Sequence, residues 1–203
     1  MPHSQHHIPD HIAIRRIWPA EIALYRDHLK RLDPESRRSR FGGMISDSFI
    51  DSYTQSAYGP DVMIFGAFDG DRIVAAGELR LMIKSWPTSA EAAFSVEKDY
   101  QDHGIGDALF GRLLVAAQNR NINSITIICL RENDRMRRLA QKHSAKLNFA
   151  DGEISGQLAP AWSSPTTYLE EAIGEANGLV KHFLNWSAKH LPFPANRADD
   201  EAA

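Results

Sequence analysis

The chain has 203 residues, of which 43% are hydrophobic and 24% are charged, and its formal net charge is −3. This balance is typical of one globular domain that can bury a core, and it gives no basic field that would attract nucleic acid. The single cysteine, Cys129, excludes an internal disulfide and any multi-cysteine zinc site. No apolar run approaches the ~18 residues that span a bilayer, and the N-terminus lacks the apolar core of a signal peptide. We therefore expect a cytoplasmic protein that binds neither nucleic acid nor membrane.

The N-terminus is rich in histidine, with His3, His6, His7 and His11 in the first eleven residues. A histidine-rich tract can bind metal. Here, however, no cysteine or carboxylate cluster accompanies the histidines at ligand spacing. We therefore favour a polar, disordered terminus over residues 1–10 and expect no metal site.

Apolar periodicity and capping residues predict the elements of the first half of the chain. Pro19 favours the start of a helix, Asp33 caps a second helix that ends at Gly42, and Ser46 caps a third. Two strands joined by a short turn at residues 69–71 follow, and a third strand comes after Pro87. The expected elements are a strand over 11–17, helices over 19–32, 33–41 and 46–57, and strands over 62–68, 72–82 and 88–96.

The second half alternates helices and strands and then ends in a long amphipathic segment. Residues 124–130 are apolar on both faces, which predicts a strand that is buried on both sides. Residues 146–159 predict a hairpin around Asp151 and Gly152. Further helices are expected over 108–119, 133–143 and 164–190. The last carries an apolar stripe that packs on its own domain or pairs between the subunits of a homodimer: Leu169, Ala172, Ile173, Ala176, Val180 and Phe183. We expect residues 191–203 to be disordered.

Two glycines, Gly104 and Gly106, lie between a predicted strand and a predicted helix in the stretch YQDHGIG. Backbone N–H groups at the start of a helix can bind an anion, and glycine lets a pyrophosphate approach the main chain. A dinucleotide-binding fingerprint would need a third glycine where Leu109 stands, and a Walker A loop would need a lysine and a different spacing. The motif that remains is Q-x-x-G-x-G, beginning at Gln101.

The order of elements around this motif resembles the GNAT superfamily of acyl-CoA N-acyltransferases over roughly residues 12–158. The stretches LDPESRRSRF (32–41) and AEAAFSVEKDYQDHGIG (90–106) are also similar to the acetyltransferase domain of bacterial protein-lysine acetyltransferases. The resemblance implies an α/β (α+β) fold with a mostly antiparallel mixed sheet flanked by helices, over residues 11–160. The helix over 164–190 would be an addition to this domain.

The resemblance also implies a co-substrate, acetyl-CoA, and the residues that bind it. In this family the loop backbone holds the CoA pyrophosphate, here Gln101, Asp102, His103, Gly104, Ile105 and Gly106. The strand that ends at Val96 would pair with the pantetheine arm, and Asn133 would hydrogen-bond to it. Three residues depart from the family pattern: Asp102 and Ser144 replace glycines, and Ala140 stands where many members have a tyrosine that protonates the leaving thiolate.

Glu91 is the predicted general base, because the resembling subgroup has a functional glutamate five residues before the strand-end valine, here Val96. Strict alternation along the strand puts Glu91 and Val96 on opposite faces. A β-bulge between them would bring both to the site. Glu91 could instead be an ordinary solvent-facing residue, and Glu78 on the neighbouring strand is the reserve candidate.

Two other groups of residues have a structural alternative. Cys129 could be a nucleophile, but its apolar neighbours favour a small core residue. Arg135, Arg137, Arg138 and Lys142 could meet the CoA 3′-phosphate or form a solvated helix face.

Two functions from different classes follow from these residues. The first is an N-acetyltransferase that moves an acetyl group from acetyl-CoA to a primary amine, on a protein lysine or on a small molecule. The second is a non-catalytic acyl-CoA-binding or sensing module, which the missing tyrosine at position 140 favours.

Overall fold

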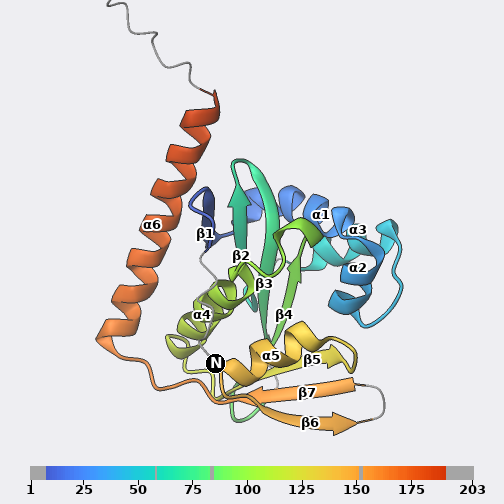
Figure 1. The fold of residues 1–203 in the computed structure, drawn as a ribbon. Helices are drawn as coiled ribbons and strands as arrows, with labels where there is room; N and C mark the ends of the chain where they lie inside the picture. The colour runs from blue at the N-terminus through green and yellow to red at the C-terminus, as the bar shows by residue number, and fades with distance from the viewer. Residues whose placement is uncertain (1–7, 58, 83–84, 151–152, 191–203) are drawn as a thin grey trace, which may run out of the picture.

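The structure is a computed structural model that describes residues 8–57, 59–82, 85–150 and 153–190 (Figure 1). Its centre is one seven-stranded sheet with the order β1-β2-β3-β4-β5-β7-β6. Neighbouring strands are antiparallel except β4 and β5, which are parallel. The strands are β1 Ile12–Arg16, β2 Val62–Asp69, β3 Arg72–Met82, β4 Ser89–Val96, β5 Ser124–Leu130, β6 Lys146–Ala150 and β7 Glu153–Leu158. The predicted mixed, mostly antiparallel sheet is confirmed.

The sheet forks between its two central strands. The pairing of β4 with β5 runs from Ser89↔Ser124 to Ala92↔Ile127 and stops there, although both strands continue. By contrast, β4 stays paired with β3 along its full length, from Met82↔Ser89 to Ala75↔Val96. The ends of β4 and β5 therefore have unpaired edges that face one another.

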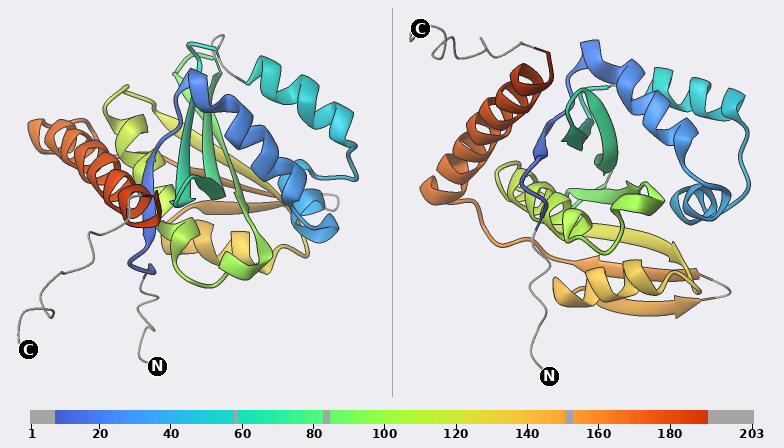
Figure 2. Two further views of the ribbon diagram at one scale, coloured as in Figure 1. Left: turned by 90° about the horizontal axis from the view of Figure 1, so that it is seen from above. Right: turned by 45° about the horizontal axis from the view of Figure 1, so that its top comes forward.

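Helices cover both faces of the sheet and bury two separate cores (Figure 2). Helices α1 (Ile22–Arg31), α2 (Pro34–Phe41) and α3 (Asp47–Ser56) lie on one face, where Tyr25, Leu29 and Ile50 are fully buried. Helices α4 (Ile105–Gln118) and α5 (Asp134–Lys142) lie on the other face. The short 3-10 helices η1 (Pro19–Glu21) and η2 (Lys98–Tyr100) precede α1 and the glycine loop.

Capping residues set the helix boundaries largely as predicted. The Asp33 carboxylate accepts hydrogen bonds from the backbone N–H groups of Glu35 and Ser36, and Ser46 caps α3 in the same way. Helix α4 begins at Ile105, earlier than the predicted residue 108, because Gly104 is its N-cap and adopts a left-handed φ of 75°. The last residues of the glycine motif thus form the first turn of the helix.

The predicted burial of β5 is wrong, and of the two alternatives for the apolar stripe of the last helix the structure does not show packing on its own domain. Strand β5 is not buried on both sides, because Ile128 is 50% exposed where β5 separates from β4. Helix α6 (Pro165–His190) packs against β1 and α4, but its apolar stripe does not face them, since Leu169, Val180 and Phe183 are exposed.

Several expectations fall on residues outside the described ranges. These are the disorder of residues 1–7 and 191–203, the turn at Asp151 and Gly152, and three of the four N-terminal histidines. In the part of the chain that the structure describes, no helix is both long and apolar enough to cross a membrane.

Candidate active site

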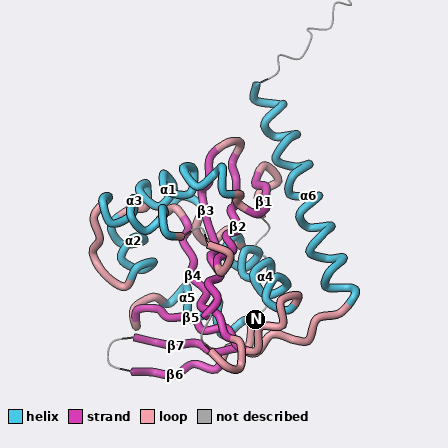
Figure 3. Tube along the Cα trace, turned by 180° about the vertical axis from the view of Figure 1, so that it is seen from behind, coloured by secondary structure: helices cyan, strands magenta, loops and turns pink. Residues whose placement is uncertain are grey.

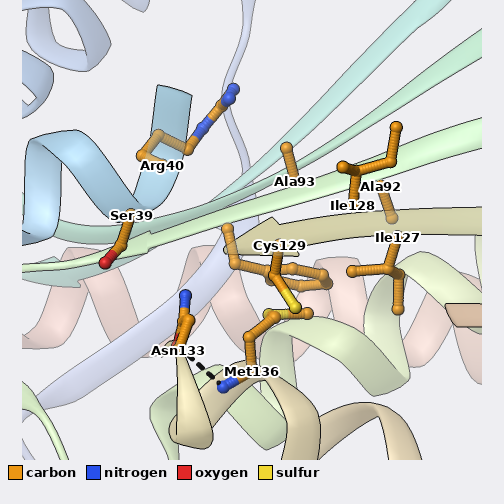
Figure 4. A pocket seen from close by; sticks show the side chains of 10 residues that line it. Ser39, Arg40, Ala92, Ala93, Ile127, Ile128, Cys129, Asn133 and Met136 are labelled. Atoms are coloured by element: carbon orange, nitrogen blue, oxygen red, sulfur yellow. Dashed lines mark hydrogen bonds between the residues drawn. The ribbon is translucent and has the colours of Figure 1, made fainter. Parts of the chain in front are cut away.

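A pocket lies at the fork of the sheet, between the ends of β4 and β5 (Figure 4). Strand β4 contributes small or apolar walls, and β5 contributes three consecutive side chains that include Cys129. Helix α2 closes one side with polar residues, and the start of α5 closes another. The lining residues are Ser39, Arg40, Ala92, Ala93, Phe94, Ile127, Ile128, Cys129, Asn133 and Met136.

The glycine loop places an uncapped helix N-terminus beside the end of β4. The N-cap Gly104 offers no side-chain hydrogen bond to α4, and the first helical hydrogen bond runs from Ala108 N–H to the Gly104 carbonyl. The amides at the start of α4 therefore have no helical acceptor, and the helix dipole adds positive potential there. A Cβ built at Gly106 would meet only Leu139, at an ordinary 3.9 Å. Protein packing therefore leaves room for a side chain at this position.

Side chains of the loop brace it against the rest of the domain. Gln101 donates from Nε2 to the carbonyl of Val96 at 3.1 Å and to Ser36 Oγ at 3.0 Å. His103 Nδ1 lies 2.6 Å from the Gln101 carbonyl, and Ile105 is buried in the core. Gln101 and His103 thus hold the loop in shape, while the backbone N–H groups at the start of α4 stay without a helical acceptor.

Asp102 has a left-handed φ of 62° and forms an ion pair with Arg135 of α5 at 2.9 Å. The hydrogen bonds that Arg135 donates to the Asp102 carboxylate raise the pKa of Arg135. A second link joins α4 to α5, since Asp107 accepts hydrogen bonds from Lys142 and His143, both at 2.8 Å. Burial would raise the pKa of Asp107, but these two partners hold it below its usual value.

Asn133 caps α5 and lines the pocket at the same time. Its Oδ1 accepts a hydrogen bond from the backbone N–H of Met136 at 3.0 Å. This bond fixes the amide so that its nitrogen points toward the opening of the fork (Figure 4). The predicted α5 starts at Asp134, with Asn133 as its cap rather than its first residue.

Glu91 lies on β4 one residue before the pairing with β5 ends. Its neighbours in the sheet are Arg80 on β3 and Thr126 on β5, and its side chain is exposed. The predicted β-bulge between Glu91 and Val96 is wrong, because β3 and β4 pair without a register shift over this stretch. Strict alternation therefore holds: Val96 packs against the core under α4, and Glu91 projects from the face that carries α1–α3.

Glu78 is buried on the same face and accepts four hydrogen bonds from protein side chains. Its carboxylate accepts from Tyr53 at 2.6 Å, Arg80 at 2.9 Å, Tyr25 at 3.0 Å and Arg40 at 3.1 Å. Burial raises the pKa of both tyrosines, so they remain donors. Three of these donors meet Oε2 and Arg80 alone meets Oε1, so the carboxylate is tied to protein donors before any substrate binds. Its evident role is to hold Arg40 at the pocket wall.

The sequence matches the model of the Acetyltransferase (GNAT) family over residues 27–144. The chain belongs to this family. Among solved structures, the GNAT domain of S. lividans PAT superposes with a TM-score of 0.62 at 19% identity, covering 72% of this chain and 89% of that one. The PaiA N-acetyltransferase of Thermoplasma acidophilum in complex with coenzyme A gives a TM-score of 0.55 at 18% identity, over 73% and 98% of the two chains. The ribosomal-protein-S18-alanine N-acetyltransferase of Escherichia coli superposes with a TM-score of 0.57 at 14% identity, covering 76% of this chain and 97% of that one. No curated protein sequence matches the chain.

The three departures from the GNAT pattern have different structural consequences. Asp102 and Ser144 replace glycines, and both have a φ of 62°, so the backbone keeps a left-handed shape without glycine. Ala140 is buried in α5, and its methyl group cannot donate a proton.

Cys129 lines the pocket, but its chemistry argues against a nucleophile. Burial raises the pKa of its thiol, with Arg137 acting weakly in the opposite direction. A reactive cysteine needs a lowered pKa. The thiol is therefore an apolar part of the wall.

Sequence analysis missed the contribution of α2 to this GNAT pocket. Ser39 and Arg40 lie in the stretch 32–41 that carried the resemblance, but no local pattern marked them as site residues. Arg40 is brought to the fork by Glu78, which lies 38 positions later in the chain. Of the basic residues proposed for the CoA 3′-phosphate, Arg135, Arg137 and Lys142 form ion pairs with Asp102, Asp134 and Asp107.

Proposed function

We propose that this GNAT protein transfers an acetyl group from acetyl-CoA to a primary amine by direct attack at the fork of β4 and β5. The observation that carries the proposal is the combination of an uncapped helix start at Gly104 with a pocket between unpaired strand edges. The first suits a pyrophosphate, and the second offers backbone groups to an extended amide-containing arm. Together they match the two chemically different parts of CoA.

The residues present fit acetyl-CoA in these roles. The amides at the start of α4 would bind the pyrophosphate oxygens, and Gly106 leaves space for their approach. The unpaired edge of β4, up to Val96, and the amide nitrogen of Asn133 would hydrogen-bond to the pantetheine arm. The apolar walls from Ala92, Phe94 and Ile127 would surround the thioester.

Glu91 would act as the general base. The amine lone pair attacks the thioester carbonyl carbon, the C–S bond breaks, and CoA leaves as a thiolate, while the amine proton passes to Glu91. Glu91 is exposed beside the fork, so it can pass the proton on to solvent. Ala140 cannot protonate the thiolate, so that proton comes from solvent.

The acceptor would approach from the face that carries α1–α3, because Glu91, Ser39 and Arg40 open toward it. A lysine side chain is long enough to carry an amine into such an opening. The resemblance to a PAT acetyltransferase domain supports a protein lysine as acceptor, with a small-molecule amine as the second class.

The test is release of CoA thiol with a panel of small amines and lysine peptides, followed by Glu91→Gln. Loss of a general base typically costs ~10²–10⁴-fold in rate, so kcat should fall by this factor while acetyl-CoA affinity stays unchanged. Glu170→Gln is the control, since Glu170 is an exposed glutamate of α6, which packs against β1 and α4 and not at the fork. Glu78→Gln is unsuitable as a control, because removal of its charge would leave Arg40 buried without its carboxylate.

Normal turnover by Glu91→Gln with a proven acceptor would exclude Glu91 as the base. The buried Ala140 favours one second candidate, an acyl-CoA-binding module without turnover. That function would show tight acetyl-CoA binding by calorimetry and no thiol release with any acceptor in the panel.

A further inference from the structure

Helix α6 lies on the domain with its polar face inward and its apolar face outward. Its inward residues form ion pairs and hydrogen bonds: Glu175 with Arg112 at 2.9 Å, Glu171 with Arg120 at 3.0 Å, and Asn185 with the His11 carbonyl at 2.6 Å. Gly178 is buried at the contact with β1, where a Cβ would meet the Ile14 carbonyl and Arg15. An amphipathic helix normally buries its apolar face, so the orientation of α6 requires an explanation.

The outward face is apolar along most of the helix. At 3.6 residues per turn, its nine apolar residues fall within an arc of roughly 160°. They repeat at heptad spacing, as in Leu169, Ala176 and Phe183, which favours contact with another helix. We call this surface the α6 face; it consists of Tyr168, Leu169, Ala172, Ile173, Ala176, Leu179, Val180, Phe183 and Leu184, all of which are exposed.

The α6 face is large enough to support a stable contact. Its seven larger side chains are between 46% and 60% exposed. The two aromatic side chains carry roughly 150–250 Å² each and the five aliphatic ones less, so the seven together expose roughly 500–700 Å² of mostly apolar area. A typical stable interface buries about 800 Å² on each partner, whereas the largest apolar patch on a monomer usually covers about 300–600 Å².

We propose that two copies of this chain pair through their α6 faces, with the helices antiparallel and a two-fold axis at Ala176. This arrangement makes the face complementary to itself. The small residues Ala172 and Ala176 lie at the centre, where they let the helices approach closely. The large residues meet toward the ends, with Leu169 opposite Phe183, Ile173 opposite Leu179 and Tyr168 opposite Leu184 of the second copy.

Charge also fits this arrangement. Glu170 and Lys181 lie on the same edge of the α6 face, six residues before and five residues after Ala176. The two-fold axis puts this edge against the same edge of the second copy. Measured along the helix axis, Glu170 of each copy then lies within about 1.5 Å of Lys181 of the other copy. Two such opposite-charge pairs flank the apolar contact.

A membrane surface would be the other occupant for an exposed apolar helix face. Helices that lie on membranes carry lysine and arginine on their polar face. Here the polar face of α6 is turned into the domain, and its carboxylates Glu171 and Glu175 are paired with arginines of α4. A second copy therefore fits better than a lipid surface.

The pairing would leave the candidate active site open. Helix α6 stands at the edge of the molecule on the side of β1, away from α2, α3 and the fork (Figures 1 and 3). The proposal therefore goes beyond acetyl transfer and does not depend on it.

Sedimentation velocity of the full chain over a concentration series tests the pairing. We expect a dimer in the unmodified protein and a monomer after Ile173→Asp combined with Val180→Asp. Met44→Asp is the control, because Met44 is 78% exposed and lies away from α6, so this variant should remain dimeric. Circular dichroism shows whether each variant is folded. A monomer at every concentration, or a dimer that survives the double substitution, would overturn the proposal, and so would a monomer that instead sediments with anionic phosphatidylglycerol vesicles.

Single cysteines test the antiparallel arrangement. Two Ala176→Cys residues would meet at the axis and form an intermolecular disulfide on oxidation, whereas two Leu169→Cys residues would lie roughly 20 Å apart along the helices, beyond the ~7 Å that a disulfide can bridge. The native Cys129 is common to both variants and is buried. A covalent dimer of Leu169→Cys, or none of Ala176→Cys, would overturn the two-fold axis at Ala176.

Discussion

At the scale of single residues, the glycine loop keeps its family shape with an unusual residue. Asp102 adopts a left-handed φ of 62°, a conformation that glycine adopts without cost and that aspartate tolerates better than most residues. The Asp102 carboxylate also binds Arg135, which would otherwise be free to meet an anion at the loop. Asp102 therefore places a negative charge, and neutralises a positive one, next to the proposed phosphate site.

Replacement of Asp102 by glycine should strengthen acetyl-CoA binding. The change removes one carboxylate from the neighbourhood of the phosphates and releases the Arg135 guanidinium. Exposed charge pairs contribute about 0.2–1 kcal/mol each, so we expect a gain of about two- to fivefold in affinity by calorimetric titration. The gain should shrink at high salt, because exposed charges are screened. Equal or weaker binding by Asp102→Gly would show that the carboxylate does not oppose the cofactor.

The candidate site shows which residues a sequence can reveal. Gly104 and Gly106 were predictable because their positions depend on local chain shape at the start of a helix. Asn133 was indicated only by the resemblance to the family, and its role as the cap of α5 came from the structure. Arg40 was not predictable, because its position depends on Glu78 on a distant strand. The face of Glu91 followed correctly from strand alternation, and the bulge introduced to change it does not exist.

At the scale of elements, a buried polar cluster joins α1 to the end of β4. His28 is fully buried, with Nδ1 3.1 Å from Glu97 and Nε2 2.9 Å from Ser95 Oγ. Burial lowers the pKa of His28 and outweighs the opposing effect of Glu97. The neutral ring satisfies both partners, with Nδ1–H donating to Glu97 and Nε2 accepting from the Ser95 hydroxyl. Arg31 and Arg72 also bind Glu97 from the rim.

This cluster predicts a loss of stability in mild acid. Because the pKa of His28 lies below its ordinary value of 6.5 in the folded state, the unfolded chain binds a proton first as the pH falls. The stabilisation is therefore complete above about pH 6.5 and is lost as the pH decreases below it. Glu97, whose pKa is also lowered from 4.5 because its hydrogen bonds and arginine partners outweigh burial, adds a further loss below its own ordinary value.

Urea unfolding at a series of pH values between neutral and mildly acidic measures this effect. The free energy of unfolding should fall with pH in the unmodified protein, and it should fall less in His28→Gln, which cannot be protonated. His11→Gln is the control, because His11 is exposed. An unchanged pH dependence in His28→Gln would show that the imidazole is not the titrating group.

Element boundaries were predictable where a cap or a periodic pattern defined them, as for α2, α3 and β2. The orientation of α6 was not, because an apolar stripe indicates that a face will be covered but not by what. Burial on β5 was overestimated for a related reason. Ile128 is apolar, yet it borders the fork, and only the pairing of β5 with β4 reveals where the fork opens.

At the scale of the whole molecule, the fork divides the sheet into two parts. Strands β1–β4 and strands β5–β7 are joined in the sheet by four residue pairs, Ser89↔Ser124 to Ala92↔Ile127. Helix α4 begins beside the end of β4, whereas Asn133 and α5 follow β5. The proposed acetyl-CoA site takes its phosphate-binding amides from the first region and its pantetheine-binding amide from the second. A bound cofactor would therefore link both parts of the fold.

Acetyl-CoA should accordingly raise the melting temperature of the protein. At a free concentration of about 100 times Kd, a ligand that binds only the folded state adds about 2.7 kcal/mol to the free energy of unfolding, which corresponds to a rise of roughly 5–10 °C for a chain of this size.

Gly106→Ala is the matched control. Its Cβ meets only Leu139 at 3.9 Å, so the unliganded variant should melt like the parent protein. In the proposed site, however, the methyl group would lie where the pyrophosphate approaches. We expect the ligand-induced shift to be largely lost in Gly106→Ala, since forcing a methyl group against a tightly packed ligand costs about 1–3 kcal/mol. Gly104 is a less suitable position for this test, because a side chain at a φ of 75° would be strained. A misfolded variant could then not be distinguished from one that had lost acetyl-CoA binding. An equal shift in parent and variant, measured by differential scanning fluorimetry, would show that the cofactor stabilises the fold without contacting this loop.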